Sequence, residues 1–487
     1  MSNKYDAIIM GSGIGGLTAG ALLAKQGMRV AVLEQHSRPG GCCQGFSRQG
    51  FSFDSSVHSV CMAENGFVCG MLRELGVRDD IAVVPNSSTA RIMSPDLDFI
   101  LPADLAALTA SLANNFPSEK NAVADLLSDM QKLFTTYKGA LAQDSQRPAA
   151  ASGIAAATQS YGDYIGRFIK DGNLKYLFGA IWPFGGSSPS YAPVYNALIF
   201  IAHAVEGSHY VKGGFSNLAE VLCAAITRSG GEVKTNWRVT GMDIDAAKAV
   251  RAVRNAAGEE FSAGVFISNI SPYTLHHQII PEKSRNQLWL RRLANLKPSV
   301  AAVCVYLGTD GDASDIAKDN LTFWFGSNDH DEMYRGIMNG PRDETNHLLI
   351  IRPPGEKNGT ITLIHFVKPE TKADWASQKR KIAGAMIKKA CHVLGDFSSR
   401  IRVKESASPA TFERYTGNTG GACYGFENVK DLYGQSKLPF ATYLSNLYQV
   451  GHWTIAGGGI YNVMMSGKVV AEIILKQFSV GSGKLKD

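Results

Sequence analysis

The amino-acid sequence predicts an α/β fold in which a parallel sheet is built from separate parts of the chain around an inserted, mainly antiparallel region. Three observations predict this fold. A strand, a glycine-rich turn, a helix and a second strand follow one another in residues 6–34. A strand, a glycine loop and a helix close the chain in residues 446–475. Between them lie apolar strands separated by polar segments, and 487 residues suffice for two or three domains.

The N-terminal unit has the residue types that a bound dinucleotide requires. An apolar strand leads into the turn at residues 11–16 (Gly-Ser-Gly-Ile-Gly-Gly), and the next apolar strand ends in Glu34. Gly11 permits a tight turn, Gly13 lets the backbone approach a pyrophosphate, and Gly16 lets the helix pack closely on the strand. The helix N-terminus offers free amides to the phosphates. Glu34 can bind a ribose hydroxyl and disfavours a 2′-phosphate, so the unit predicts FAD or NAD rather than NADP.

The following residues narrow the cofactor. Arg38 and the pair Gly40-Gly41 come soon after Glu34, and this spacing resembles the E-x-x-x-R-x-G-G pattern of two-dinucleotide-binding-domain flavoproteins. The resemblance implies that Arg38 pairs with the pyrophosphate and that the two glycines let the backbone lie against a flavin. It therefore implies FAD as a resident cofactor.

Charge and apolar patterning bound the function. The net charge is +6, from 49 basic and 43 acidic residues spread along the chain, which argues against a nucleic-acid partner and is compatible with an anionic membrane surface. No secretory signal is visible, and the longest apolar stretch, residues 194–205, is too short to span a bilayer. We expect a cytoplasmic protein, either free or peripheral on a membrane.

The eight cysteines show no CxxC pair and no zinc spacing, so we expect reduced thiols and no metal site. The neighbours Cys42 and Cys43 have two interpretations. They could form a redox pair at the flavin, or they could be small packing residues.

Residues 44–59 predict a hairpin turning at Gln49-Gly50. This segment resembles one in the phytoene desaturase family, in which a phenylalanine-aspartate step and a nearby histidine lie beside the flavin. The matching residues here are Phe53, Asp54 and His58. The family usually has glycine after the aspartate, whereas this chain has Ser55-Ser56. His58 is therefore either a structural histidine or one that touches flavin or substrate.

The next segments predict helices. Residues 91–100 suggest a hairpin, residues 103–138 are helical in period, and residues 139–160 predict a loop or a weakly packed helix. The apolar residues from Leu174 to Trp182 fall on one helix face. That face either packs in a core or docks on lipid beside Lys170 and Lys175.

The middle of the chain predicts a return to the first sheet. Lys212-Gly213-Gly214 precedes a helical pattern and resembles the lysine-glycine-glycine step of the same family. Lys212 either places positive charge near a reduced flavin or caps a turn. Strands at residues 232–239 and 250–253 suggest a meander, and a strand at 263–269 rejoins the dinucleotide sheet. Strands at 299–308 and 361–367 suit the second, antiparallel sheet.

In the C-terminal unit, a strand at residues 447–450 is followed by Gly457-Gly458-Gly459 and a helix whose amides could face the flavin or its ribityl chain. The unit resembles the family's closing motif. There the strand usually ends in glycine-aspartate, the acid holding the ribityl or pyrophosphate region; this chain has Gly451-His452. We expect the tail from Ser479 to be disordered.

The order of these motifs resembles the bacterial phytoene desaturase, carotenoid isomerase and retinol saturase group. The resemblance implies an FAD-binding Rossmann-like domain with an inserted substrate domain of antiparallel sheet and helices. The predicted division is 1–85, 206–275 and 416–487 for FAD, the last with the tail, and 86–205 (helical, membrane-facing) and 276–415 for the substrate. The predicted catalytic residues are His58 and Lys212. The predicted cofactor-binding residues are Gly11, Gly13, Ile14, Gly15, Gly16, Glu34, Gln35, Arg38, Gly40, Gly41, Val239, Gly451, His452, Gly458, Gly459 and Ile460.

The resemblance leaves several functions open. The first is a redox enzyme, a desaturase or saturase, acting on carbon–carbon bonds of a long apolar polyene or isoprenoid-type lipid at a membrane surface. The second is a redox-neutral carotenoid cis–trans isomerase that uses reduced FAD. The third is an FAD-free lipid-binding or prenyl-protein-binding protein on the same fold, which the intact glycine loops oppose. An amine oxidase shares the FAD motifs and is a further alternative.

Overall fold

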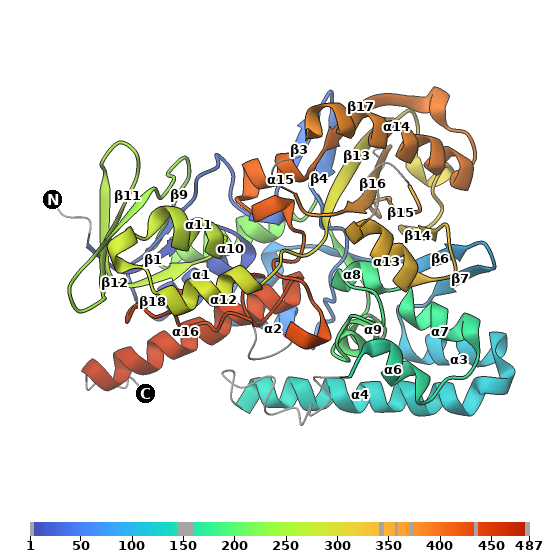
Figure 1. Ribbon diagram of the computed structural model, residues 1–487, viewed down its shortest axis with the longest axis horizontal. Coiled ribbons are helices and arrows are strands. Elements are labelled where there is room, and N and C mark those ends of the chain that lie inside the picture. Colours follow the sequence, from blue (N-terminus) through green and yellow to red (C-terminus); the bar gives the residue numbers. More distant parts are fainter. Residues whose placement is uncertain are drawn as a thin grey trace.

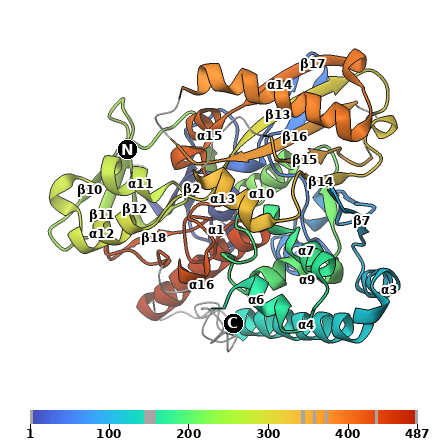
Figure 2. The same cartoon turned by 45° about the vertical axis from the view of Figure 1, so that its right-hand side comes forward.

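The computed structural model describes residues 4–143, 159–339, 345–355, 359–370, 374–432 and 437–482. Two sheets organise these residues, and Figure 1 shows them side by side, with the first sheet on the left and the second at the upper right. A group of helices lies beneath the second sheet. In Figure 2 the long helices α4 (Lys120–Gln143) and α16 (Ile460–Ser482) lie along the lower edge of the molecule.

The first sheet has seven strands in the order β10-β11-β12-β1-β2-β9, with β18 also pairing with β12. Strands β12, β1, β2, β9 and β18 run parallel, and β10 and β11 form an antiparallel extension. The strands are β1 (Lys4–Met10), β2 (Val30–Leu33), β9 (Glu232–Lys234), β10 (Gly241–Ile244), β11 (Val250–Arg254), β12 (Glu260–Ser268) and β18 (Leu447–Gln449). The sheet therefore combines predicted FAD-domain pieces from the start, middle and end of the chain.

Both faces of this sheet are covered, which explains its apolar strands. In β1, Ala7 and Ile9 pack in the core beneath helix α1 (Ile14–Lys25), whereas Ile8 and Met10 face the opposite core. Helix α1 in turn contacts α10 (Ser216–Arg228) and α16. Because α1 is buried almost all round, its sequence is apolar all round rather than on one stripe.

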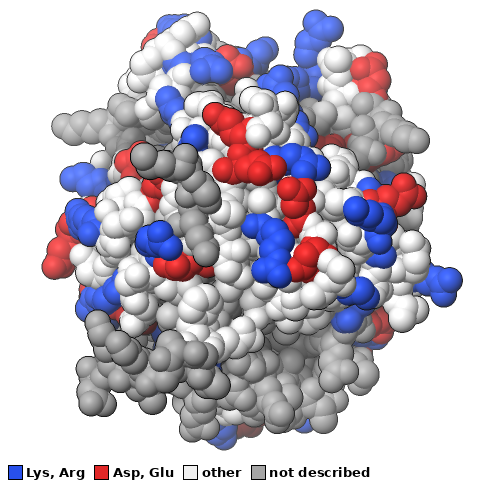
Figure 3. All heavy atoms as spheres, turned by 90° about the vertical axis from the view of Figure 1, so that its left-hand side faces the viewer, with Lys and Arg blue, Asp and Glu red and all other residues white. Residues whose placement is uncertain are grey.

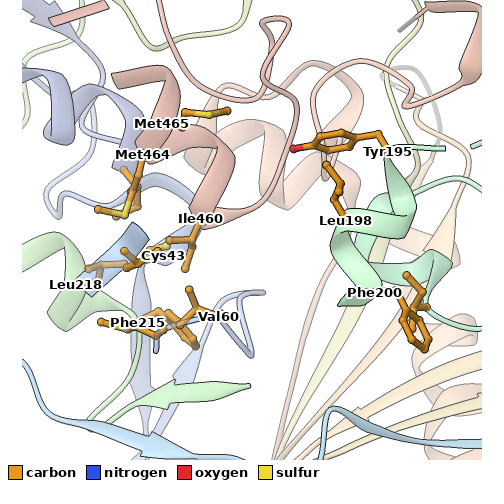
Figure 4. Packing of buried hydrophobic residues seen from close by; sticks show 14 of the residues in the cluster. Cys43, Val60, Tyr195, Leu198, Phe200, Phe215, Leu218, Ile460, Met464 and Met465 are labelled. Atoms are coloured by element: carbon orange, nitrogen blue, oxygen red, sulfur yellow. The ribbon is translucent and has the colours of Figure 1, made fainter. Parts of the chain in front are cut away.

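The core between these helices continues toward the glycine turns. Figure 4 shows part of it, where Ile460 and Met464 of α16 lie toward Cys43 and Leu218. The ends of the chain therefore pack against each other on the same side of the first sheet.

The second sheet has the order β17-β13-β16-β15-β14-β6-β7 and is antiparallel except for the β14–β6 pair. Its strands are β6 (Ala90–Ser94), β7 (Leu97–Leu101), β13 (Ala301–Thr309), β14 (Leu321–Phe325), β15 (His347–Ile351), β16 (Thr360–Val367) and β17 (Ile401–Ala407). Helix α14 (Trp375–Leu394) covers one face with Val303, Leu348 and Leu363 beneath it. The opposite face of the central strands remains available to line a cavity.

Several short elements complete the structure. The hairpins predicted at residues 44–59 and 91–100 are confirmed as β3–β4 and β6–β7. The remaining elements are β3 (Gly45–Arg48), β4 (Phe51–Asp54), β5 (Val83–Pro85), β8 (His209–Val211), α2 (Phe67–Glu74), α3 (Leu105–Asn115), α6 (Tyr161–Gly166), α7 (Gly172–Gly179), α8 (Trp182–Gly185), α9 (Asn196–Val205), α11 (Pro272–Thr274), α12 (Gln287–Asn295), α13 (His330–Asn339) and α15 (Pro409–Thr416), besides short 3₁₀ and π turns.

Two predicted elements are corrected. The helical period at residues 103–138 is two helices, α3 and α4, because Pro117 lacks an amide hydrogen and Phe116 before it has non-helical backbone angles (φ −129°, ψ 64°). The strand predicted at 232–239 ends at Lys234, because Asn236 takes a positive φ of 54°, which interrupts the extended conformation. The meander is instead formed by β10, β11 and β12.

The apolar face from Leu174 to Trp182 lies in the core. Leu174, Leu177, Phe178 and Trp182 are each at most 1% exposed, so the core interpretation of this face is confirmed. Most of residues 139–160 lie outside the described part of the chain. Residues 139–143 and 479–482 belong to helices α4 and α16, and the rest of the tail is outside the described part.

Surface charge is mixed where it can be seen. On the face shown in Figure 3, basic and acidic side chains are interspersed, and neither sign dominates a region of that face. None of the helices in the described part of the chain combines the length and apolar content that crossing a bilayer requires.

We keep the five-segment domain division as a proposal. The first sheet draws its strands from 1–85, 206–275 and 416–487, and the second sheet draws its strands from 86–205 and 276–415.

Candidate functional site

A cavity of about 470 Å³ lies where the carboxyl ends of the parallel strands meet the second sheet. Its size is in the range of about 300–1,000 Å³ that is typical of small-molecule sites. One end is lined by the glycine turn after β1, by Glu34 and by the segment from Trp237 to Val239. The other end is lined by side chains of β13, β15 and β16.

The two N-terminal glycine segments are held together by their backbones. The amide of Gly40 donates to the carbonyl of Ser12 at 3.0 Å, and Gly13 forms an isolated bridge with Gly40. A Cβ on Gly41 would lie 3.1 Å from the Cα of Gly13, and Gly41 has a φ of +57°. The sequence pattern thus reflects a close backbone contact beside the cavity.

The start of α1 fits the phosphates of a dinucleotide. Gly13 is its N-cap and no side chain caps the helix, so the first amides keep no intrahelical partner. Gly13, Ile14 and Gly15 line the cavity, and the two glycines have no side chain to cover their backbone. Backbone amides at a helix N-terminus, bare toward a cavity, suit an anionic pyrophosphate.

Glu34 is fixed at the end of β2. It is 6% exposed, and its Oε2 accepts from the amide of Ser12 at 2.9 Å and from Ser12 Oγ at 2.6 Å. Its Oε1 accepts from the amide of His36 at 2.8 Å. The carboxylate also lines the cavity and has lone pairs left for a ribose hydroxyl.

The C-terminal glycine segment meets the same place. A Cβ on Gly15 would lie 3.0 Å from the carbonyl oxygen of Val463 and 3.2 Å from the amide nitrogen of Gly451. Asn269, which follows β12, lies between the segments, since its amide group would obstruct a Cβ on Gly13 and also one on Gly451. Asn269 was not among the predicted site residues. A polar residue at the carboxyl end of a parallel strand is the signal that could have indicated it.

The residues after Gly451 bring a polar cluster to the cavity. His452 Nε2 and Trp453 Nε1 lie 3.0 and 3.1 Å from Asn418 Oδ1. Asn418 Nδ2 donates toward Cys42 Sγ at 3.6 Å. All four residues line the cavity, and neither Asn418 nor Trp453 was predicted from the sequence.

His58 lines the cavity beside Phe184 of the apolar end. Its Nδ1 is 3.1 Å from the carbonyl oxygen of Ser56, so Nδ1 carries the proton, and Nε2 is buried without a hydrogen-bond partner. The ring stacks on Phe184 with centroids 5.8 Å apart. Burial lowers the pKa of His58 to about 4, so the ring is neutral near pH 7. Behind it, a pocket of about 10 Å³ bordered by Asp54 and Tyr210 has room for about one water.

The end of the cavity at the second sheet is apolar. Ala302, Leu349, Ile364 and Phe366 line it from the sheet, and Phe184 lines it from α8. Further lining residues at this end are Val57, Cys304, Ala422, Cys423 and Tyr424. No carboxylate is found among the described residues that line this end.

The structure brings most of the predicted site residues together at this cavity. Those that line it are Gly11, Gly13, Ile14, Gly15, Glu34, Gln35, Gly40, Gly41, His58, Val239, Gly451, His452, Gly459 and Ile460. Their contacts with a cofactor stay predictions. Gly16 lies behind the lining, where a Cβ would be 2.5 Å from the carbonyl oxygen of Gly11. Gly458 packs against Tyr424 and does not line the cavity.

Arg38 and Lys212 lie outside the lining. Arg38 is exposed, and its guanidinium donates to the carbonyl of Gly45 at 3.2 Å, where it holds the loop to β3. Lys212 is also exposed and its carbonyl accepts from Asn217 at 2.8 Å, which fits the turn interpretation better than a charge near the flavin. The lining therefore gives no support to a cofactor contact by Arg38 or a catalytic contact by Lys212.

The glycines after Lys212 have a clear structural purpose. Asp54 accepts hydrogen bonds from the amide of Phe215 at 2.7 Å and from Tyr210 at 2.6 Å. A Cβ on Gly214 would lie 3.0 Å from Asp54 Oδ1, and Gly214 has a φ of +99°. The two family-like steps, Phe53-Asp54 and Gly213-Gly214, are thus two sides of one contact.

All eight cysteines are free thiols. Cys42, Cys43, Cys304 and Cys423 line the cavity, and burial raises the pKa of Cys42 to about 11. They are protonated near pH 7 and act as small side chains in the wall, in line with the packing interpretation of Cys42 and Cys43.

A parallel sheet with a glycine turn, an acid after the second strand and a C-terminal helix closing on the same cavity defines a dinucleotide-binding flavoprotein. The chain belongs to the family of flavin-containing amine oxidoreductases, whose model matches residues 14–475. It is an oxidoreductase, and its cofactor is FAD.

Relatives of this chain cover nearly its whole length. It is 23% identical to an all-trans-retinol 13,14-reductase of Homo sapiens, over 97% of this chain and 86% of the relative. It is 26% identical to a chloroplastic prolycopene isomerase of Daucus carota (98% and 82%). It is 22% identical to a 4,4'-diapophytoene desaturase of Methylomonas (99% and 97%).

Solved structures share the fold. An oxidoreductase from Methanosarcina mazei has a TM-score of 0.64 at 17% identity, covering 96% of this chain and all of that chain. A putrescine oxidase bound to putrescine has a TM-score of 0.64 at 14% identity, over 98% of this chain and 100% of the other. At these identities the likeness shows the fold alone.

Proposed function

We propose that this protein transfers hydride between FAD and a carbon–carbon bond of a long apolar isoprenoid lipid, as a desaturase or saturase. The observation that carries the proposal is the single cavity with two unlike ends. One end is backbone and glycine at a helix N-terminus, and the other is an apolar wall from the second sheet. The compounds in the names of the relatives above, retinol, prolycopene and diapophytoene, are all isoprenoids.

The lining also argues against an amine substrate. A polyamine carries positive charges, and burying them requires carboxylates or other acceptors. Among the described residues the acidic side chains lining the cavity are Glu34 and Glu413, both away from the apolar end. An apolar chain satisfies that end by displacing water from its surface.

FAD, when bound, supplies the acceptor or donor of the hydride. The chain's own residues orient the lipid and exclude water around the reacting carbons. Adding hydrogen across a double bond needs a proton besides the hydride, and removing it releases one. In the desaturase direction we assign acceptance of the released proton to His58 Nε2, which is unprotonated, buried, otherwise unpartnered and part of a residue that lines the cavity. In the saturase direction the same nitrogen must first take up a proton before it can donate one to the lipid. The water-sized pocket beside Asp54 offers this proton a way out.

The supply of such a lipid favours contact with a membrane surface, since isoprenoid hydrocarbons dissolve in bilayers. Leu288 of α12 is 73% exposed next to the exposed Arg291, and such a pair suits an anionic interface. Sedimentation with vesicles containing anionic lipid tests this part, and equal recovery in the supernatant with and without vesicles would contradict it.

The purified protein allows a direct test of the reaction. It should show oxidised-flavin absorption bands, and anaerobic incubation with a polyene lipid should bleach them, or reoxidise the reduced form, while the lipid changes mass by two hydrogens. Isomerised lipid of unchanged mass would instead favour the isomerase, which the 26% identity to the carrot protein supports. Bleaching by putrescine but by no isoprenoid would overturn the proposal.

A further inference from the structure

The cluster of His452, Trp453 and Asn418 determines where the protons of the histidine lie. An indole N–H is only a donor, so the Asn418 atom facing Trp453 at 3.1 Å is its oxygen. The same oxygen faces His452 Nε2 at 3.0 Å. Because that oxygen accepts, Nε2 must donate and must carry a proton. Asn418 is 7% exposed and Trp453 3%, so water competes little for these bonds.

The other ring nitrogen of His452 is left for the cavity. Burial lowers the pKa of His452 to about 4, and a neutral ring with its proton on Nε2 has a lone pair on Nδ1. Among the described residues Nδ1 has no hydrogen-bond partner, and it is not among the fully buried polar atoms that lack one, so it is accessible. Because His452 lines the cavity, this accessible Nδ1 is placed to accept a hydrogen bond from a group bound there.

The position of His452 points to the sugar–phosphate part of the cofactor. It follows Gly451, whose amide nitrogen would lie 3.2 Å from a Cβ on Gly15. Gly15 belongs to the glycine turn at the start of α1 that fits the pyrophosphate. In the closing motif that this chain resembles, the residue after the glycine is an aspartate. A neutral acceptor beside a pyrophosphate accepts from a hydroxyl without adding negative charge there.

We propose that His452 is a neutral hydrogen-bond acceptor for a ribityl hydroxyl of FAD, and that Asn418 and Trp453 set its tautomer. Asn418 is then a positioning residue, since it acts through the imidazole. The proposal rests on FAD as the cofactor and not on the identity of the lipid. The charged residues lining the same cavity are Glu34, Arg238, Glu413 and Arg414, and its other titratable lining residues include the neutral His58 and Cys42, whose neutral thiol accepts from Asn418.

The variant Asn418→Asp tests whether residue 418 controls the protonation of His452 and, through it, the binding of FAD. A carboxylate still accepts from Trp453 and His452, but it favours the doubly protonated ring, which has no acceptor. We expect the Kd for FAD at pH 7.5, measured by flavin fluorescence with the apoprotein, to rise about tenfold, the usual effect of one hydrogen bond. The midpoint pH for FAD release on acidification should shift upward by about one unit or more. Asn295→Asp adds the same charge at an exposed helix end and should change neither value.

A double-mutant cycle separates this role from a general structural one. His452→Phe keeps a ring but lacks Nδ1, and we expect it also to weaken FAD binding about tenfold. Adding Asn418→Asp to it should cost nothing further and should leave the pH midpoint unchanged, because no imidazole remains to be charged. Additive losses in the double variant would overturn the proposal, as would unchanged affinity in either single variant.

A measurement on the unmodified protein covers the case in which a variant does not fold. The ¹⁵N shifts of labelled histidine in the FAD-bound protein should show a neutral His452 protonated at Nε2. A ring protonated at Nδ1, or an imidazolium at pH 7.5, would overturn the proposal. Purified protein that takes up no FAD would show that FAD is not the cofactor. That result would overturn the proposed function as well as this inference.

Discussion

The two ends of the cavity are built in different ways. At the first sheet the wall is backbone, since Gly11, Gly13, Gly15, Gly41 and Gly451 remove side chains where a ligand or another strand must approach. At the second sheet the wall is side chain, contributed by alternate residues of β13, β15 and β16 whose neighbours in sequence face α14. A wall made of backbone tolerates no added atom, whereas a wall of apolar side chains can change shape and keep the fold.

The largest effect that this contrast predicts is at Gly16, which does not line the cavity but packs directly behind the backbone wall, against Gly11. A methyl group there would meet the carbonyl oxygen of Gly11 at 2.5 Å, so Gly16→Ala must displace backbone. We expect a destabilisation on the order of 3 kcal/mol and protein without bound FAD, measured by urea unfolding and by the flavin spectrum. Gly384→Ala in α14, where a Cβ meets nothing within 4 Å, is the control and should keep both. A flavin-loaded Gly16→Ala of normal stability would show that the backbone wall is less rigid than we infer.

The next effect concerns the second sheet at low pH. His365 is 2% exposed and burial lowers its pKa to about 4 from the ordinary 6.5. Between these values the unfolded chain binds a proton that the folded chain does not, so stability is complete above pH 6.5 and falls as pH drops toward 4. The loss is about 3 kcal/mol from this residue. Urea unfolding at pH 7 and pH 5 measures the part lost by pH 5, about 2 kcal/mol, and His365→Gln should reduce the slope whereas the exposed His392→Gln should not.

A third prediction concerns His58, which lines the cavity beside Phe184 of the apolar end. His58→Asn removes the proton acceptor without adding volume, and we expect kcat to fall roughly 100-fold, the usual range for acid–base groups. FAD content should remain full, as the residue is not part of the glycine wall. His392→Asn serves as the matched control. A loss of FAD together with activity would mean that His58 supports the cofactor rather than the reaction.

A fourth prediction concerns a buried lysine beside the C-terminal glycine loop, at the backbone-walled end of the cavity. Lys437 is 2% exposed, its Nζ donates to Asn428 at 3.3 Å, and burial lowers its pKa to about 8. The unfolded lysine keeps its proton up to about pH 10.5, so this group makes the protein more stable as pH rises from 8 to 10. Lys437→Met should be more stable by about 2 kcal/mol at pH 7, and the difference should shrink at pH 10. Equal stability of the two proteins at both pH values would contradict the buried charge.

The smallest effect uses two adjacent leucines of β15. Leu349 lines the cavity and Leu348 packs beneath α14 on the opposite face. Leu349→Val and Leu348→Val should each lose about 1 kcal/mol of stability. Only Leu349→Val should change kcat/KM for the lipid, by roughly tenfold, because only it reshapes the apolar wall. Equal kinetic effects would mean that the wall is not the substrate surface.

The residues that were predicted correctly from the sequence, and those that were not, divide between the two ends of the cavity and the loops around them. The glycine turns, Glu34 and the strands of the first sheet were predicted from the sequence because a dinucleotide site constrains short, contiguous stretches. Arg38 and Lys212 were assigned to the site by resemblance alone, and their side chains lie outside the lining. Asn418 was not predicted, because its segment has no motif of its own. Trp453 and Asn269 lie in segments that were recognised, but no pattern marked these two side chains as lining the cavity.

The sequence by itself determined the class of fold and the cofactor end, since backbone conformation at each glycine turn is a local property. It also determined that a second sheet exists, through the apolar strands at β13 and β16. Only the tertiary structure decided which residues of that sheet face the cavity and which face α14, because alternate residues of strands buried on both faces are equally apolar. It alone placed Asn418 against His452, 34 positions along the chain, and so fixed which nitrogen of that ring carries the proton.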